Sequence, residues 1–247
     1  MLMFDRLKRM FGGTGVSAPA SGFSSRDSVL FGDWAKSQGM AYTDGALLPT
    51  KGSYHNLFQL EGTVRQKHWR IECGPPGRDF IQGQELRARG ELGILDSVSV
   101  VLMNRPLKGA LEKRAYSLYT DSLHTAVDPK LPEEMRWLAI YPEVGWSDAP
   151  NLFFDRYAVL SGKREHAAAW IKGSLAHALM NWPPSGPSSQ VPFVMMLLRG
   201  RCYLRMQFTG MDMATLQHTI ALYVTACESA LQNVSQDLSG DHGVSTS

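Results

Sequence analysis

A chain of 247 residues that is 44% hydrophobic and contains six tryptophans can bury a substantial core, so we expect a globular protein of one large domain or two small ones. Its formal net charge of +2 is too small to attract nucleic acid by its field alone. Three widely spaced cysteines argue against a disulfide framework and a thiolate metal site, and they favour a reducing compartment. We expect neither a bound metal nor a cofactor.

The N-terminal segment, residues 1–11, has apolar residues at helical spacing and cations on the other side. Such a basic amphipathic segment can lie on an anionic membrane or dock to a partner. The alternative is a frayed terminus that contacts its own domain. The residues that would make the docking contact are Phe4, Leu7, Phe11, Arg6, Lys8 and Arg9.

Residues 12–25 are rich in glycine and serine and predict a flexible linker, so residues 1–25 are expected to be a leader joined to the folded body. Charges in the first nine residues interrupt any secretory signal, and no apolar run approaches the ~20 residues of a spanning helix. We therefore expect a cytoplasmic protein, with any membrane contact being peripheral and on the inner face.

The first half of the body, residues 26–120, is expected to contain a helix, two to four strands and a second helix. The hairpin is the clearest of these elements, because apolar residues alternate on both sides of a turn near Arg65-Gln66. The expected elements are a helix over 27–37, a hairpin over 58–73, an edge strand within 78–93, a strand over 97–103, and a helix from Pro106 to about Tyr116.

The second half, residues 121–234, is organised around the most apolar run of the chain. Val191–Leu198 has apolar side chains on both faces, which predicts a central strand, and a turn at Arg199-Gly200 leads into an alternating strand. The remaining expected elements are strands over 134–141 and 152–160, a helix over 163–181 and a helix from Asp212, giving a ββαββα order. Residues 235–247 are polar and are expected to be a disordered tail.

Together these elements predict an α+β fold: an antiparallel, hairpin-built sheet, or two such sheets, with helices packed mainly on one face. Two pseudo-repeated halves, joined near residues 119–132, remain an open alternative, since no residue-level repeat is visible.

One candidate binding surface comes from the strand that follows the central one. Its alternation places Arg201, Tyr203 and Arg205 on one side, and His68 and Arg70 would join them if both strands belong to the same sheet. A basic face with interleaved aromatics can bind an acidic protein or single-stranded nucleic acid. The alternative is a solvated face whose long side chains cover their neighbours.

A second candidate is a helix start at Gly162, Lys163 and Arg164, where backbone donors and two cations could hold a phosphate or carboxylate. The phosphate-loop pattern is incomplete there, so an ordinary helix start is the competing interpretation. No catalytic residue is assigned, because a serine-nucleophile elbow around Ser147 would have to run from a strand directly into a helix, and Pro150 follows instead.

Each enzyme motif considered lacks the flanking residues or secondary structure that it requires, so the sequence favours a non-enzymatic interaction or regulatory module. The alternatives are a small-molecule or phosphate-binding enzyme that uses Gly162 to Arg164, and nucleic-acid binding through the Arg201, Tyr203 and Arg205 face. We expect a protein partner rather than nucleic acid. The charged fraction of 19% is low for a soluble domain, which favours apolar surface that a partner or a second copy of the chain covers. The basic N-terminal segment leaves a membrane surface as a further partner.

Overall fold

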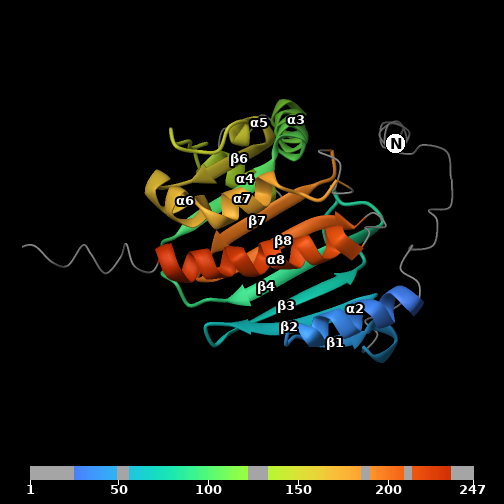
Figure 1. Ribbon diagram of the computed structural model, residues 1–247. Helices are drawn as coiled ribbons and strands as arrows, with labels where there is room; N and C mark the ends of the chain where they lie inside the picture. The colour runs from blue at the N-terminus through green and yellow to red at the C-terminus, as the bar shows by residue number, and fades with distance from the viewer. Residues whose placement is uncertain (1–24, 49–55, 122–132, 185–189, 209–212, 235–247) are drawn as a thin grey trace, which may run out of the picture.

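The computed structural model describes residues 25–48, 56–121, 133–184, 190–208 and 213–234, which form one eight-stranded antiparallel sheet with helices on both faces (Figure 1). The sheet order is β1-β2-β3-β4-β8-β7-β5-β6. The strands are β1 Ala41–Asp44, β2 Phe58–Val64, β3 Lys67–Gly74, β4 Gln84–Glu91, β5 Ser99–Asn104, β6 Tyr157–Ser161, β7 Phe193–Leu198 and β8 Arg201–Phe208. The helices are α2 Ser25–Ser37, α3 Arg105–Asp121, α4 Glu133–Ile140, α5 Phe153–Arg156, α6 Arg164–Ile171, α7 Ser174–Met180 and α8 Met213–Ser229. The predicted α+β class and antiparallel sheet are confirmed.

Two tight turns build the hairpins of this sheet. Arg65 and Gln66 have φ values of 45° and 66°, and Arg199 and Gly200 have φ values of 52° and 72°. Two consecutive residues with positive φ are typical of the type I′ turn, whose twist matches that of the strands it joins. Both predicted hairpin turns are therefore confirmed, with β2 pairing with β3 and β7 with β8.

The two faces of the sheet are covered unequally. On one face, α2, α6, α7 and α8 pack against side chains from strands β2 to β8 and form the main core, as Figure 1 shows from that side. On the other face, within the described residues, Leu107 and Leu111 of α3 and Trp137 of α4 pack with buried side chains of β5, β6 and β7, and Tyr203 of β8 lies at the margin of this cluster. The prediction that helices lie mainly on one face is confirmed.

Strand β7 is interior, as its apolar run predicts. All six of its residues are buried, and the strand lies between β8 and β5. Met195 and Leu197 belong to the main core, whereas Val194 and Met196 face α3 and α4. A strand with apolar side chains on both faces must be covered on both faces, and β7 is covered by the main core on one face and by α3 and α4 on the other.

Four predictions of local structure are wrong. Residues 134–141 form the helix α4 rather than a strand, since a short apolar run does not distinguish the two by its period. Within 152–160, α5 precedes β6. The helix expected over 163–181 is two helices, separated at Gly173, whose φ of 74° ends the first and starts the second. The edge strand within 78–93 is β4, which lies inside the sheet between β3 and β8.

Strands from the two predicted halves are interleaved in one sheet. Strand β4 of the first half pairs with β8 of the second, and β5 lies between β7 and β6. Of the segment over 119–132 that was expected to join the two halves, residues 119–121 belong to α3, which is longer than predicted, and residues 122–132 lie outside the described residues. Residues 1–24 of the expected leader and the expected tail over 235–247 lie outside them as well. Within the part of the chain that the structure describes, no helix has the length and hydropathy that a membrane span requires.

The contact between Gly62 and Trp69 provides a test of this packing. A Cβ atom added at Gly62 would lie 2.3 Å from Cζ2 of Trp69, which is itself 2% exposed and packs edge-on against Tyr223. We expect Gly62→Ala to lower the free energy of unfolding by about 1–3 kcal/mol, because overpacking forces a buried ring to move. Urea denaturation of the full chain measures this loss.

The matched control is Gly109→Ala in α3, where nothing lies within 4 Å of the added atom. This change should leave stability unaltered or raise it by up to about 1 kcal/mol, because alanine favours a helix interior. Equal effects of the two variants would contradict the packing described for Trp69.

Candidate binding surface

Among the described residues, the helices on the sheet face opposite α8 pack mainly on β5, β6 and β7, and we call the side chains that β2, β3, β4 and β8 direct to this face the open face. Register joins its residues into rows across the sheet. One row runs through Glu61, Arg70, Arg89 and Tyr203 and continues into Met196 of β7. The polar open face and the apolar surface beneath α3 and α4 are therefore two parts of one sheet face.

The structure places all five residues of the predicted binding surface on this open face. Arg201, Tyr203 and Arg205 alternate along β8 with buried neighbours. Arg70 lies in the same row as Tyr203, and His68 lies two residues before Arg70 on β3. The two strands belong to one sheet, as the predicted surface requires. The binding role of these residues stays a prediction.

The arginines of the open face are paired with glutamates. Arg70 Nε lies 3.1 Å from Glu72, and Arg87 donates to the same carboxylate over 3.0 Å. Arg201 donates to Glu91 over 2.6 Å, and this bond lowers the pKa of the Glu91 carboxyl.

Arg89 binds that carboxylate as well, so Glu91 serves two cations. His68 Nε2 lies 4.0 Å from Glu61. Because carboxylates alternate with the cations in this way, the open face lacks the unneutralised positive charge that phosphate backbones attract.

Glu85 anchors the end of this network next to β8. Its side chain is fully buried, accepts a 2.6 Å hydrogen bond from Gly77 N–H, and pairs with Arg205. Arg87 Nη1 lies 4.0 Å from the same carboxylate. A buried carboxylate is tolerated when cations and amide donors satisfy it, as they do here. The pair therefore fixes the position of the Arg205 guanidinium.

A groove lies where the open face meets α4, with a cavity volume of about 360 Å³. Its floor is apolar, because Met196, Leu198 and Trp137 are buried core residues. The residues that line it are Arg78, Asp96, Ser99, Glu133, Arg136, Trp137, Ile140, Tyr141, Met196, Leu198, Arg199, Tyr203 and Arg205. The lining combines two tyrosines and a tryptophan with four arginines, against two carboxylates.

Two of these arginines are not neutralised. Arg78 and Arg205 pair with the carboxylates of α4 and β4, but neither Arg136 nor Arg199 forms an ion pair with any residue in the described ranges. The Nε atom of Arg136 is buried and without a hydrogen-bond partner there. Beside its apolar floor, the groove therefore offers two positive charges without a counter-charge in the described part of the chain.

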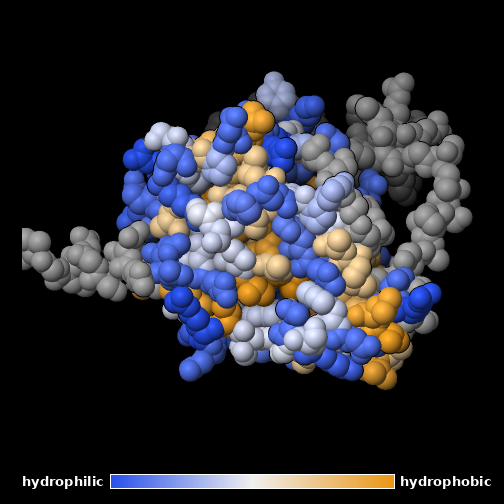
Figure 2. All heavy atoms as spheres, in the orientation of Figure 1, coloured by the Kyte–Doolittle hydropathy of each residue, from blue (hydrophilic) through white to orange (hydrophobic). Residues whose placement is uncertain are grey.

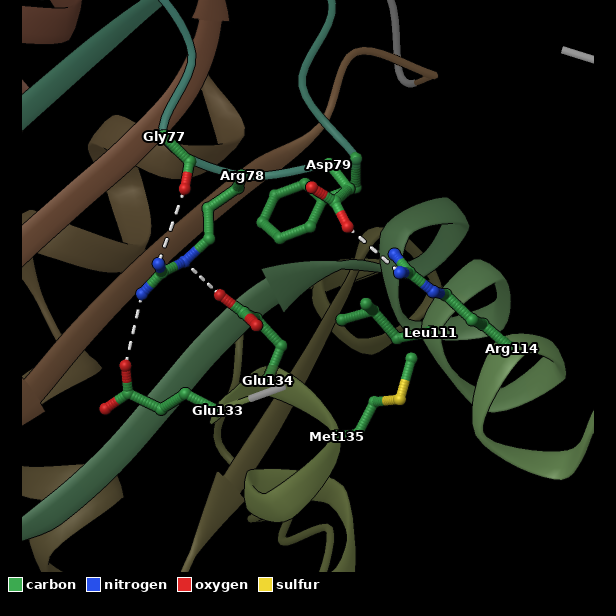
Figure 3. Close-up of a pocket in the computed structure, with 9 residues that line it drawn as sticks. Gly77, Arg78, Asp79, Leu111, Arg114, Glu133, Glu134 and Met135 are labelled. Carbon is green, nitrogen blue, oxygen red and sulfur yellow. Dashed lines mark hydrogen bonds and ion pairs between the residues drawn. The ribbon is translucent and has the colours of Figure 1, made fainter. Parts of the chain in front are cut away.

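The segment from Gly77 to Phe80, which we call the wall, lines a smaller pocket of about 170 Å³ that shares Arg78 and Glu133 with the groove (Figure 3). Arg78 reaches from the wall to Glu133, at 3.1 Å, and to Glu134 of α4. Asp79 accepts a 3.0 Å bond from Arg114 of α3. These ion pairs tie the wall to both helices, so the charges around the smaller pocket are used to hold α4 in place.

The predicted anion site at Gly162 to Arg164 is a helix start, since β6 ends at Ser161 and α6 begins at Arg164. Ser161 Oγ accepts the Lys163 N–H over 3.2 Å, so one amide of this helix start is already bonded within the protein. The Arg164 side chain lies 3.6 Å from Glu165. Anion binding at this position stays a prediction.

The three cysteines are buried and unpaired. Burial raises the pKa of the Cys73 and Cys202 thiols, which keeps them protonated and unreactive. Among the described residues, no three His, Cys, Asp or Glu side chains are grouped to hold a metal ion.

Sequence reasoning missed the α4 side of the groove. Arg136, Trp137 and Tyr141 were assigned to a strand, and Arg199 was read only as part of a turn. The residue types of this segment could have indicated the site. Arg136 stands next to Trp137, and arginine and tryptophan are enriched at protein interfaces.

Comparison with known proteins gives a weak structural similarity. No protein-family model and no curated protein matches the chain. Among solved structures, the chain is similar to the mycobacterial trehalose monomycolate transport factor A, TtfA, with 13% sequence identity and a TM-score of 0.44. The match covers 82% of this chain and 93% of that one.

The difference between buried and exposed carboxylates on the open face is testable. Glu85→Gln removes the buried charge beside Arg205, so we expect the free energy of unfolding to fall by about 3 kcal/mol. Glu91→Gln removes a carboxylate that also binds an arginine but is 52% exposed, and its loss should be at most about 1 kcal/mol. Chemical denaturation compares the two, and equal losses would contradict the role of Glu85 as a buried anchor.

Proposed function

We propose that this chain is a non-enzymatic interaction module that binds a segment of a partner protein in the groove between α4 and β8. The observation that supports this most directly is the combination of a buried apolar floor with the unpaired arginines Arg136 and Arg199 at its side. The preferred segment presents an apolar or aromatic side chain next to an aspartate or glutamate.

The residue types of the groove favour a protein partner. Tyrosine, tryptophan, methionine and arginine are enriched at the centres of protein interfaces, and Tyr203, Trp137, Met196 and Arg136 supply one of each. The cavity volume of about 360 Å³ is at the lower end for small-molecule sites, and it suits a few side chains of a bound segment.

Charge supports the acidic preference. Arg205 is held by Glu85 and Arg78 by α4, so these two cations already have counter-charges. Arg136 and Arg199 would gain theirs from the bound segment, and a hydrogen bond to a charged group contributes about 1.5–3 kcal/mol. Tyr203, which packs against the apolar cluster beneath α4, would contact the apolar side chain of the same segment.

Selection of a displayed random-peptide library against the full chain tests this proposal. We expect the selected peptides to share an aromatic or large aliphatic residue flanked by acidic residues. Their affinity should fall at least about tenfold in the double variant Arg136→Gln with Arg199→Asn, which corresponds to about 1.4 kcal/mol. Asparagine is chosen at position 199 because it tolerates the positive φ of Arg199.

The matched control is Arg70→Gln with Arg89→Gln, which removes the same number of positive charges from the same sheet face but outside the groove. Affinity should be nearly unchanged in this control. Peptides without acidic residues, or equal losses in both double variants, would contradict binding in the groove.

Nucleic-acid binding and a phosphate-binding enzyme, the two alternative functions from the sequence analysis, can each be tested by a separate measurement. Nucleic-acid binding through Arg201, Tyr203 and Arg205 requires affinity for a single strand such as poly(dT) that falls steeply with salt, and the pairing of Arg201 and Arg205 with glutamates disfavours it. A phosphate-binding enzyme that uses Gly162 to Arg164 requires phosphate affinity that is lost in Lys163→Ala with Arg164→Ala.

We further propose that the N-terminal segment docks the module to an anionic membrane surface, on the cytoplasmic side, through its apolar residues and its cations. The amphipathic spacing within residues 1–11 supports this. The full chain should sediment with vesicles that contain anionic lipid, and the triple variant Arg6→Gln, Lys8→Gln, Arg9→Gln should lose most of this binding, because each cation contributes about 1 kcal/mol near such a surface. Binding that is equal on neutral vesicles, or unchanged in the variant, would contradict it.

A further inference from the structure

The edge of the sheet at β1 carries an exposed apolar patch. Val29 and Leu30 of α2 are 63% and 54% exposed, and Leu47, which follows β1, is 79% exposed. Figure 2 shows hydrophobic atoms gathered at the end of the molecule where Figure 1 places α2 and β1. Val29 and Leu30 are adjacent on α2, and adjacent large apolar side chains that stay exposed are candidates for cover by another molecule.

The helix α2 is firmly held on its inner side, so the patch is presented on a rigid support. Phe31 is fully buried and packs against Phe58 of β2, with ring centroids 5.0 Å apart. Ser28 hydrogen-bonds to Tyr42 and Asp44 of β1. Val29 and Leu30 therefore occupy the outer side of α2, whose position is fixed by its contacts with the core.

The outer side of α2 is complementary to itself. Arg26, Val29, Leu30 and Asp33 are all exposed. Val29 and Leu30 lie three and four residues after Arg26, and Asp33 lies four and three residues after them, which places all four along one stripe of the helix. If two copies of α2 cross in antiparallel orientation about a two-fold axis near Leu30, Arg26 of each copy meets Asp33 of the other. Val29 of each copy then meets Leu30 of the other.

This arrangement is what a two-fold interface requires, because each contact must occur twice with the roles exchanged. Neither Arg26 nor Asp33 forms an ion pair with another residue in the ranges that the structure describes. A membrane would fit this stripe less well, since Asp33 lies on it and a basic excess is typical of helices that lie on anionic lipid.

From this geometry we infer that two copies of the chain form a two-fold dimer through the outer side of α2, with Val29 and Leu30 at its centre and Arg26–Asp33 ion pairs on both sides. The groove lies on the opposite sheet face near β8, which β2, β3 and β4 separate from β1. The dimer therefore leaves both grooves open. Two grooves on one particle bind a partner that carries two segments more tightly than one groove does.

Charge exchange tests this interface without disturbing the core. Sedimentation equilibrium of the full chain, over about 1 to 100 μM, gives the dimer dissociation constant. Arg26→Asp places two carboxylates opposite each other at both ends of the interface, and Asp33→Arg places two arginines there. Each variant alone should raise the dissociation constant at least about tenfold.

Rescue is the decisive readout. The double variant Arg26→Asp, Asp33→Arg restores opposite charges and should regain the dimer of the original chain. An equimolar mixture of the two single variants should form a heterodimer, because each supplies the charge that the other lacks. A merely structural effect of either substitution would not produce this pattern.

The apolar centre has its own matched pair of variants. Leu30→Glu should weaken the dimer at least about tenfold, whereas Leu95→Glu, at a leucine that is 52% exposed elsewhere on the surface, should leave it unchanged. A monomeric original chain at all concentrations, or single charge variants that dimerise normally, would overturn the inference. Peptide binding in the groove is measured independently, so the two proposals can fail separately.

Discussion

Three strands of this sheet, β5, β6 and β7, are apolar on both faces, and that constraint shapes the rest of the molecule. Every residue of β6 and β7 is buried, so both faces of this part of the sheet must be covered. Helices α6, α7 and α8 cover one face, and α3 and α4 cover the other. The other strands alternate between buried and polar residues and need cover on one face only.

The candidate groove lies where the strands that are apolar on both faces adjoin the strands that alternate between buried and polar residues. At the junction of the neighbouring strands β7 and β8, the apolar surface that α4 covers meets the open face with its ion pairs. Tyr203 lies at this boundary. The ion pairs of Arg78 hold α4 over this boundary rather than over the whole sheet. A groove with an apolar floor and charged residues in its lining therefore lies where the helical cover ends.

The open face also shows why a basic strand is not by itself a nucleic-acid site. In the sequence, Arg201 and Arg205 stand next to no carboxylate, and their strand looks positively charged. Their partners, Glu91 and Glu85, come from β4, more than a hundred residues earlier in the chain. Charge balance on a sheet is decided by strand neighbours, and these are set by tertiary pairing.

Local periodicity was sufficient for several elements. The alternation around Arg65-Gln66, the apolar run of β7 and the helix after Asp212 depend on interactions between near neighbours, and each was predicted correctly. The same alternation correctly placed Arg201, Tyr203 and Arg205 on one side of their strand. Such patterns need no knowledge of the rest of the fold, because a side chain's face follows from its parity in the strand.

Only the tertiary structure decided which strands became neighbours and where α4 lies. Strand β4 pairs with β8 and β5 with β6 across long stretches of chain, and the short segment of α4 is compatible with either a strand or a helix until it packs. The amino-acid sequence by itself determined the α+β class and the faces of the clearest strands. The groove and the partners of its arginines arise from contacts between residues far apart in the sequence, which no local pattern encodes.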